Sequence, residues 1–299
     1  MSWLILSLLS ALFLGFYDLA KKAGVKENAV APVLYFSVLS SAVIWIPLMV
    51  WSYGMPASFP WERFQVQTLT PSSHLLLFLK SLLVSTSWIF NYFAVKHLPV
   101  SIASPIRATS PLWTILIAVI WMGERPTETQ WWGVVIILGA FYAFTFVGKM
   151  EGIHFHRDRW VGFMIVATLL SSCSALYDKY LLQSQSFDPA TVQCWFTIYL
   201  AIILTPFWLL WKKGWIGTHK FEWRWVIPGI GLSLLVADFL YFEALTREGA
   251  LISIISPLRR CAILVSFFGA MAAWKEKNFR PKLLCILVLL TGVVILNIR

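Results

Sequence analysis

Two arginines, Arg107 and Arg259, stand inside stretches of the sequence that are otherwise almost entirely apolar. A charge at the centre of a lipid bilayer costs roughly 2.5–3.5 kcal/mol on insertion scales, so such a charge normally faces a cavity or a partner. The planar guanidinium group suits carboxylate or phosphate because it donates two parallel hydrogen bonds. We therefore predict that Arg107 and Arg259 bind an anionic part of a substrate. The alternative is that they form buried ion pairs with acidic residues. Arg260 comes next in the chain and is expected to point to another side of its helix.

Lys80 lies on a helical stripe that also carries Trp88 and Asn91, at i+8 and i+11. A lysine in such a stripe either lines a cavity or extends along its own aliphatic stem to the membrane surface. Aromatic residues such as Tyr241 either line the cavity or pack in the core. We predict a substrate-binding set of Arg107, Arg259, Lys80, Asn91, Trp88 and Tyr241, with further aromatic candidates at Tyr92, Trp195, Tyr199 and Phe239.

Three aspartates are candidates for proton coupling or gating. Asp238 lies deep in an apolar stretch, where it either carries protons as a carboxyl of raised pKa or pairs permanently with Arg107, Lys80 or Arg259. Asp18 and Asp178 lie nearer the ends of their stretches, beside lysines at 21, 22 and 179. Ion pairing at the membrane interface is the first expectation for Asp18 and Asp178, and their corresponding positions also allow a gating role.

The composition indicates the class of protein in which these charged residues lie. Of the 299 residues, 59% are hydrophobic and only 13% are charged, and the mean hydropathy is +0.74. Such a chain is typical of a multi-pass membrane protein. The formal net charge of +10 is then expected to set the orientation and to meet anionic lipid headgroups, and nucleic-acid binding is set aside.

The sequence contains ten stretches that could each form a membrane-spanning helix, which needs about 20 mostly apolar residues. They cover residues 3–20, 32–51, 75–95, 100–121, 131–147, 160–182, 190–211, 225–245, 251–274 and 283–298. We therefore expect an all-α integral membrane fold of ten transmembrane helices.

An internal repeat divides these stretches into two sets of five. The run Ser101-Ile-Ala-Ser-Pro-Ile-Arg107 recurs as Ser253-Ile-Ile-Ser-Pro-Leu-Arg259, at an offset of 259 − 107 = 152 residues. At the same offset Thr114 matches Ser266 and Glu124 matches Glu276. Five spans are an odd number, so the second copy enters the membrane from the opposite side. We predict two inverted five-helix repeats, residues 1–150 and 151–299, with the substrate site between them near the middle of the membrane.

The repeat resembles the EamA family of ten-span transporters in the drug/metabolite transporter superfamily. The residues that carry the resemblance are Ser104-Pro105 and Gly123-Glu124 in the first half, and Ser256-Pro257 and Lys275-Glu276 in the second, where Lys275 replaces the usual glycine. The resemblance implies a transporter of metabolites.

The expected function is a secondary active transporter, an exporter or exchanger that works by alternating access. The expected substrate is a small polar metabolite of anionic or zwitterionic character, such as an amino acid or an organic or phosphorylated anion. Two alternatives are a flippase for a lipid substrate and a membrane scaffold that transports nothing. The expectations further include no enzymatic activity, no cofactor or metal, contact with membrane lipids, no nucleic acid, a monomer or homodimer, and a place in the bacterial inner membrane.

Basic residues are divided unevenly between the two sides of the predicted bundle. Loops that follow odd-numbered spans hold most of the lysines and arginines, whereas the other side holds Arg63, Arg125, Arg247 and Arg299. The positive-inside rule then places both ends of the chain outside the cytosol. Members of the EamA family generally have cytosolic ends, so the charge pattern and the resemblance predict opposite orientations.

Overall fold

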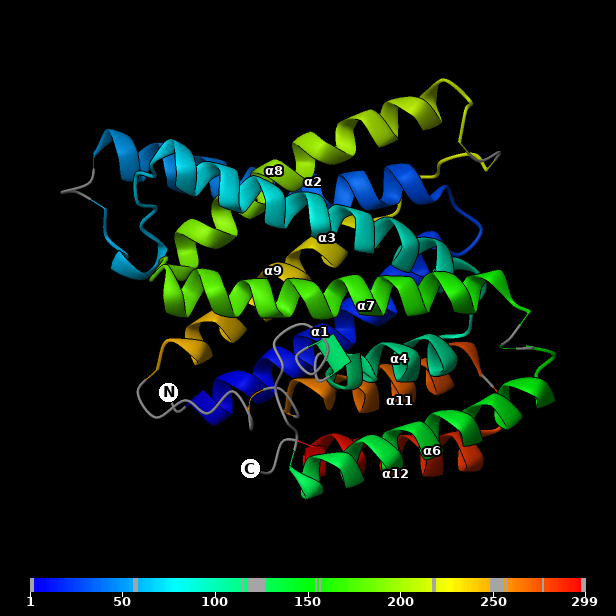
Figure 1. Cartoon of the computed structure of the whole chain (residues 1–299). Helices are drawn as coiled ribbons and strands as arrows, with labels where there is room; N and C mark the ends of the chain where they lie inside the picture. Colours follow the sequence, from blue (N-terminus) through cyan, green and yellow to red (C-terminus); the bar gives the residue numbers. More distant parts are fainter. Residues whose placement is uncertain are drawn as a thin grey trace.

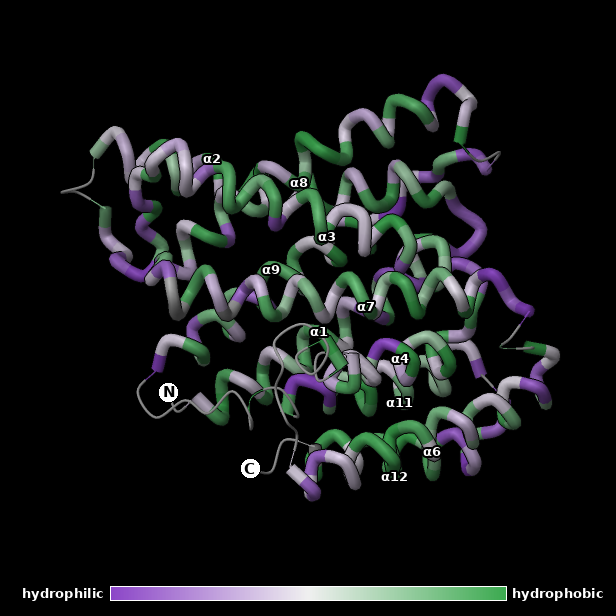
Figure 2. Tube along the Cα trace, in the orientation of Figure 1, coloured by the Kyte–Doolittle hydropathy of each residue, from purple (hydrophilic) through white to green (hydrophobic). Residues whose placement is uncertain are grey.

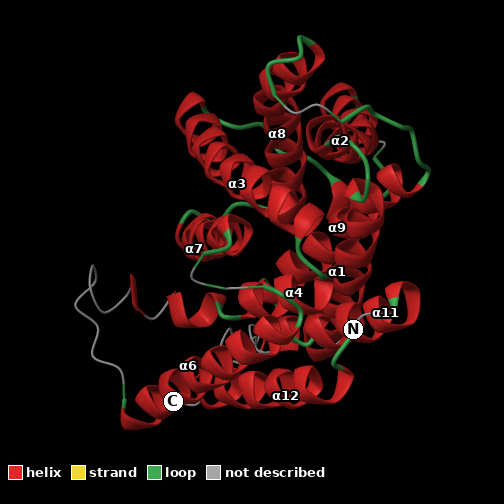
Figure 3. Ribbon diagram, turned by 90° about the vertical axis from the view of Figure 1, so that its right-hand side faces the viewer, coloured by secondary structure: helices red, strands yellow, loops and turns green. Residues whose placement is uncertain are grey.

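The computed structural model describes residues 3–55, 59–113, 116–117, 127–153, 155, 157–216, 219–247, 255, 258–275 and 277–296. Within these residues the chain is a bundle of helices without strands (Figures 1 and 3). The helices are α1 (Trp3–Val25), α2 (Val30–Gly54), α3 (Pro71–His97), α4 (Val100–Ala108), α6 (Glu128–Met150), α7 (Arg159–Lys179), α8 (Pro189–Lys212), α9 (Val226–Leu245), α11 (Ala262–Trp274) and α12 (Phe279–Leu296). A short 3-10 helix covers Glu62–Phe64, and a π-helical turn, Tyr180–Ser184, continues α7.

Seven of the described helices are long and apolar enough to cross a membrane: α1, α2, α3, α6, α7 with its π-helical turn, α8 and α9. The other three expected spans correspond to α4, α11 and α12, whose described parts have 9, 13 and 18 residues. Hydrophobic residues predominate along the helices, and hydrophilic residues are more frequent at the helix ends and in the loops (Figure 2). The chain is therefore an integral, multi-pass membrane protein, of which the described residues establish seven candidate spans.

Several helices extend beyond the apolar stretches that predict them. α1 continues through Lys21 and Lys22 to Val25, and α3 begins at Pro71 with Thr70 as its N-cap. The Thr70 hydroxyl accepts a hydrogen bond from the Ser73 amide at 3.3 Å, which satisfies a free amide of the first turn. Polar residues at both ends thus lie inside helices.

The helices pack in pairs that join distant parts of the sequence. α1 lies against α9, α3 against α7, α2 against α8, α4 against α11 and α6 against α12. Figures 1 and 3 show α6 and α12 together at one side of the bundle and α2, α3 and α8 at the other. α1, α4, α9 and α11 lie between these two groups, so charged residues on α1, α4 and α9 are enclosed by other helices.

Basic side chains bind free carbonyl groups at one end of the bundle. Lys22 Nζ donates to the carbonyls of Val95 and Leu98 at 2.8 and 2.7 Å, where α3 ends. Arg224 donates to the carbonyls of Ala23 and Lys26 at 2.9 and 2.8 Å, where α1 ends. Cations are favourable at these positions because the last carbonyls of a helix carry partial negative charge. These contacts connect the loops at this end of the molecule.

Candidate functional site

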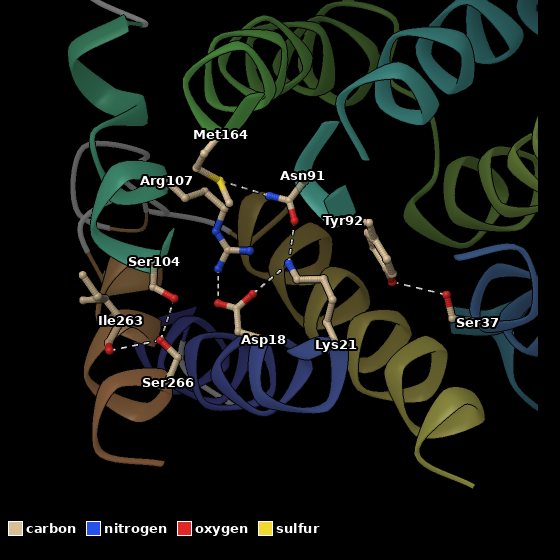
Figure 4. A network of polar contacts seen from close by, with 10 residues as sticks. All are labelled: Asp18, Lys21, Ser37, Asn91, Tyr92, Ser104, Arg107, Met164, Ile263 and Ser266. Carbon is tan, nitrogen blue, oxygen red and sulfur yellow. Dashed lines mark hydrogen bonds and ion pairs between the residues drawn. The ribbon is translucent and has the colours of Figure 1, made fainter. Parts of the chain in front are cut away.

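The first of two buried groups of charged residues is centred on Asp18 (Figure 4). Arg107 of α4 forms an ion pair with Asp18 of α1. Lys21, one turn further along α1, places its Nζ 3.2 Å from Asp18 Oδ1 and 2.7 Å from Asn91 Oδ1 of α3. Asp18 is 4% exposed and Lys21 is 1% exposed. One carboxylate therefore holds two cations at a point where three helices meet.

The second group joins residues of α3, α7 and α9 with Arg259, which precedes α11. Lys80 pairs with Asp178, and Arg259 pairs with Asp238. Lys80 Nζ also lies 4.4 Å from the centre of the Phe196 ring, and the Arg259 guanidinium lies 4.0 Å from the centre of the Tyr241 ring. Each cation thus has both a carboxylate and an aromatic face as partners, which offsets the cost of burial.

These pairs bear on the alternatives that the sequence left open. Arg107 and Arg259 are both ion-paired in this structure, and whether they bind an anionic substrate in another state stays a prediction. Asp238 has Arg259 as its partner, one of the three expected cations. Lys80 does not extend to the surface, since it is 1% exposed. Arg260 donates to Ser110 Oγ at 3.0 Å, and thus differs from Arg259 in its direction, as expected.

Asp18 and Asp178 differ from the expectation of interfacial pairing. Asp18 does pair with neighbouring Lys21, but the pair is enclosed in protein because α1 continues past Ala20 to Val25. Asp178 pairs with Lys80 from another helix, and its side chain is 14% exposed. Both carboxylates therefore belong to the interior of the bundle, because the surrounding helices cover them.

The larger pocket, with an empty volume of about 370 Å³, lies between α1, α2, α3, α8 and α9. Two predicted site residues, Trp88 and Asp238, line it, together with Tyr92 from the further aromatic candidates. The other lining residues are Tyr17, Ser37, Val38, Ser41, Gln193, Phe196, Thr197, Leu200, Ile230, Gly231, Leu234 and Leu235. We call this space the central pocket.

A smaller pocket of about 210 Å³ adjoins the Asp18 group. Its lining includes three predicted residues, Asp18, Asn91 and Arg107, and also Lys21 and Ser104. The predicted site residues are thus divided between two pockets.

Four predicted residues line neither pocket. Lys80, Asp178, Tyr241 and Arg259 lie in the protein behind the lining, where they contact one another or lining residues. Of the further aromatic candidates, Phe239 stacks on Phe64 at 4.8 Å. Trp195 and Tyr199 pack with His74, to which the Tyr199 hydroxyl is hydrogen-bonded at 2.9 Å. The sequence identified charged and aromatic residues but not which of them share one pocket.

Sequence reasoning missed the polar lining of the central pocket. α2 supplies Ser37 and Ser41, and α8 supplies Gln193 and Thr197. Each pair has i, i+4 spacing, which places both side chains on one face of a helix. A search for polar i, i+4 pairs in otherwise apolar stretches could have found them.

α2 and α9 approach each other closely beside this pocket. A Cβ added to Gly231 would lie 2.1 Å from the Ser37 carbonyl oxygen and 2.9 Å from Ser41 Oγ. Only glycine allows the two backbones to come this near. Gly231 therefore sets the spacing of two helices that form the pocket wall.

Residues of the repeated motif contact the other half at Ser101, which accepts a hydrogen bond from Lys282 Nζ at 2.6 Å, and at Ser104. Ser266 Oγ of α11 donates to Ser104 Oγ of α4 at 3.1 Å (Figure 4). The other repeated positions, Thr114, Glu124, Ser256 and Glu276, lie outside the described residues.

The long apolar helices define an integral membrane protein, and the charged residues enclosed between them give it a polar interior. The EamA-like transporter family, which is part of the drug/metabolite transporter superfamily, matches residues 1–146, nearly half of the chain. The resemblance that the Ser-Pro and Gly-Glu motifs indicated is confirmed. The match indicates a membrane transporter, and the family is generally non-enzymatic.

One solved crystal structure is similar to nearly the whole chain. The match has a TM-score of 0.61 and 13% sequence identity, and it covers 97% of this chain and 95% of the other. At this identity the similarity concerns the fold alone, and it extends through both halves of the chain. No curated protein sequence matches the chain.

Proposed function

We propose that the protein is a secondary active transporter, an exporter or exchanger, that moves a small polar metabolite by alternating access. The family match supports transport, and the position of the central pocket supports the mechanism. The first half contributes α1, α2 and α3 to this pocket and the second half contributes α8 and α9. A relative movement of the halves would therefore change which side of the membrane the pocket faces.

The observation that carries the proposal is the exchange symmetry of the helix contacts. Replacing each helix of one half by its counterpart exchanges α1 with α7, α2 with α8, α3 with α9, α4 with α11 and α6 with α12. The contact of α1 with α9 then becomes that of α7 with α3, and the contact of α2 with α9 becomes that of α8 with α3. α1 with α11 likewise becomes α7 with α4. This pattern supports two inverted repeats, residues 1–150 and 151–299, and ten spans.

An anionic substrate can bind Arg107 or Arg259 only if that arginine leaves its ion pair. An anionic or zwitterionic substrate, as the sequence predicts, would have to replace Asp18 at Arg107 or Asp238 at Arg259. Each ion pair joins two helices of the same half, so a relative movement of the halves does not by itself break it, and the substrate would have to displace the carboxylate. Arg107 and Asp18 belong to the first half, and Arg259 and Asp238 to the second.

A scaffold that transports nothing is the second candidate, because an ion-paired core is what it requires. The buried pairs of Lys80 with Asp178 and Arg259 with Asp238 agree with that role. A pocket between the halves with Asp238, Gln193 and Ser37 in its lining does not, because a scaffold has no use for a pocket in an otherwise close-packed interior. We therefore favour transport.

Access to the central pocket from each side of the membrane tests the proposal without knowledge of the substrate. We would replace the cysteines at 173, 194, 261 and 285 by alanine and introduce Ser41→Cys in the pocket. A membrane-impermeant maleimide is then applied to vesicles of either orientation. Alternating access predicts labelling of Ser41→Cys from both sides.

Ser10→Cys is the matched control. Ser10 is fully buried on α1, where its hydroxyl donates to the Ala237 carbonyl at 2.6 Å, and it lines neither described pocket. It should stay unlabelled from both sides. Labelling of Ser41→Cys from one side only, or from neither, would contradict alternating access and favour a static scaffold.

A further inference from the structure

We propose that the central pocket binds an organic ammonium group, held by Asp238 and Gln193, with the apolar part of the same molecule against Trp88 and Tyr92. The inference rests on the proposed function and names the chemical class of its substrate. It is carried by the charge of the lining, by one unpaired hydrogen-bond acceptor and by the aromatic walls.

Asp238 is the one lining residue with a formal charge among the described residues of the central pocket. Arg259, its partner, does not belong to the lining. A cation in the pocket would lie beside a carboxylate, whereas an anion would lie beside a like charge in a medium of low dielectric constant. The lining therefore favours a cationic group.

Gln193 adds an acceptor that no described residue uses. Its Nε2 donates to the Leu235 carbonyl at 2.8 Å, and because a carbonyl can only accept, this bond identifies which amide atom is the nitrogen. Its Oε1 is buried and has no hydrogen-bond partner among the described residues. An unpaired buried acceptor costs about 1–3 kcal/mol. An ammonium group has three donors that can satisfy it, and a carboxylate has none.

The neighbouring hydroxyl groups direct their protons elsewhere. Ser37 Oγ donates to the Leu34 carbonyl at 2.8 Å, and Thr197 Oγ1 donates to the Gln193 carbonyl at 2.6 Å. These oxygens retain lone pairs, so they too are acceptors toward a ligand. At Ser37 and Thr197 the lining is thus better suited to a donor than to an acceptor.

Aromatic rings enclose the remaining space and are suited to a flat apolar group or a cation. Lys21 lies 4.5 Å from the centre of the Tyr17 ring, and Lys80 lies 4.4 Å from that of Phe196. Both rings belong to the lining of the central pocket and neither lysine does, so the rings lie between the lysines and the pocket. Asp18 and Asp178 pair with these lysines and reduce their effect on a ligand.

Arg259 and a bound amine would share one carboxylate. Arg259 donates to Oδ1 of Asp238 from outside the lining and offsets the negative charge that the ammonium group needs. Amine binding should therefore compete with the ion pair, and removal of the arginine should strengthen binding. A purely structural role of Arg259 predicts the opposite, because its loss would then disorder the pocket.

The test compares two probes of the same shape and opposite charge. Tritiated phenethylamine is bound to the purified full chain in detergent, and 3-phenylpropionate, with the same ring and a chain of similar length, is added as competitor. We expect saturable phenethylamine binding that 3-phenylpropionate does not displace. Asp238→Asn should weaken binding about tenfold or more, as expected for loss of a charged partner, and Gln193→Leu about threefold or more. Arg259→Gln should strengthen it about threefold or more.

Glu243→Gln is the control for removal of a carboxylate from α9. Glu243 pairs with Arg247 at 2.9 Å and lines neither described pocket, so its loss should leave binding unchanged. Because Asp238→Asn leaves Arg259 without its partner, Gln193→Leu and Arg259→Gln keep the test decisive if that variant folds poorly. Absence of saturable binding, displacement by 3-phenylpropionate at equal concentration, unchanged binding in Gln193→Leu, or weaker binding in Arg259→Gln would overturn the proposal.

The proposed function and this inference fail in different experiments. Phenethylamine binding together with one-sided labelling of Ser41→Cys would contradict alternating access and leave the amine site intact. Two-sided labelling together with a preference for 3-phenylpropionate would keep the transporter and overturn the amine site.

Discussion

Two buried carboxylates differ in the number of cations that neutralise them. Asp18 has both Lys21 and Arg107 as partners, whereas Lys80 is the one ion-pair partner of Asp178 among the described side chains. Removing one member of a buried pair typically costs 3–5 kcal/mol, because an uncompensated charge stays inside. The two sites should therefore respond differently to loss of a cation.

We predict that Lys80→Gln lowers stability by about 3–5 kcal/mol, because Asp178 is left unpaired. Arg107→Gln should cost clearly less, because Lys21 still neutralises Asp18. Thermal unfolding of the purified variants in detergent, followed by fluorescence, measures the difference. The double variant Lys80→Gln/Asp178→Asn removes both charges and should recover most of the loss. Equal destabilisation by the two single variants would show that the number of partners is unimportant.

At the scale of helices, the wall of the central pocket depends on the contact of α9 with α2. Gly231→Ala would place a methyl group 2.1 Å from the Ser37 carbonyl oxygen, which belongs to the backbone and cannot turn away. The two helices must then separate. Overpacking of this kind costs about 1–3 kcal/mol, so we predict a lower melting temperature and altered access to Ser41→Cys.

Gly229→Ala is the matched control because it lies on the same helix. A Cβ at Gly229 meets nothing within 4 Å. Replacing a helical glycine by alanine gains roughly 0.5–1 kcal/mol where space allows, so this variant should be as stable as the parent or more stable. If Gly231→Ala behaves like Gly229→Ala, the close approach of α2 and α9 does not determine the pocket.

The helices were predictable from the sequence wherever an apolar stretch of about 20 residues forms one, as in α2, α8 and α9. The ends of the helices were harder to predict. Lys21 and Lys22 suggest that the first helix ends near Ala20, yet both are helical. Lys21 finds partners in Asp18 and Asn91, and Lys22 binds carbonyls at the end of α3. Contacts with other helices decide these boundaries, and a single stretch of sequence does not contain them.

The residues of the candidate site were likewise predictable from the sequence only in part. Asp238 could be recognised because a charge in an apolar stretch is energetically costly and normally faces a cavity or a partner. Gln193 and Ser37 were harder to recognise, because isolated polar residues are common in membrane helices and mostly serve packing, and only their i, i+4 spacing from Thr197 and Ser41 sets them apart. Their role depends on α2 and α8 coming together across the pocket, and that contact joins residues far apart in the sequence.

At the scale of the whole molecule, the basic residues mark one end of the bundle. α1 begins and α12 ends at the left of Figure 1, and the loops after α1, α3 and α8 lie at the right. The right-hand loops contain Lys26 and Arg224, among other cations. Two of the lysines on this side, Lys21 and Lys282, are 1% and 0% exposed and hydrogen-bonded inside the protein. The excess of basic residues at this end remains when these two are left out, so the pairing of these two lysines does not account for it.

We predict from this excess that the basic end faces the cytosol and that the start of α1 and the end of α12 face the other side. The chain is produced in a bacterial host with either a phosphatase active only in the periplasm or a fluorescent protein that matures only in the cytosol fused after α12. The charge pattern predicts phosphatase activity and no fluorescence. The same reporters are also fused after Glu151, where α6 ends, at the other end of the bundle from the end of α12. These fusions should give fluorescence and no phosphatase activity. Fluorescence after α12 would instead support the orientation that the EamA resemblance implies, and would mean that the loop cations serve mainly to bind helix ends, as Lys22 and Arg224 do.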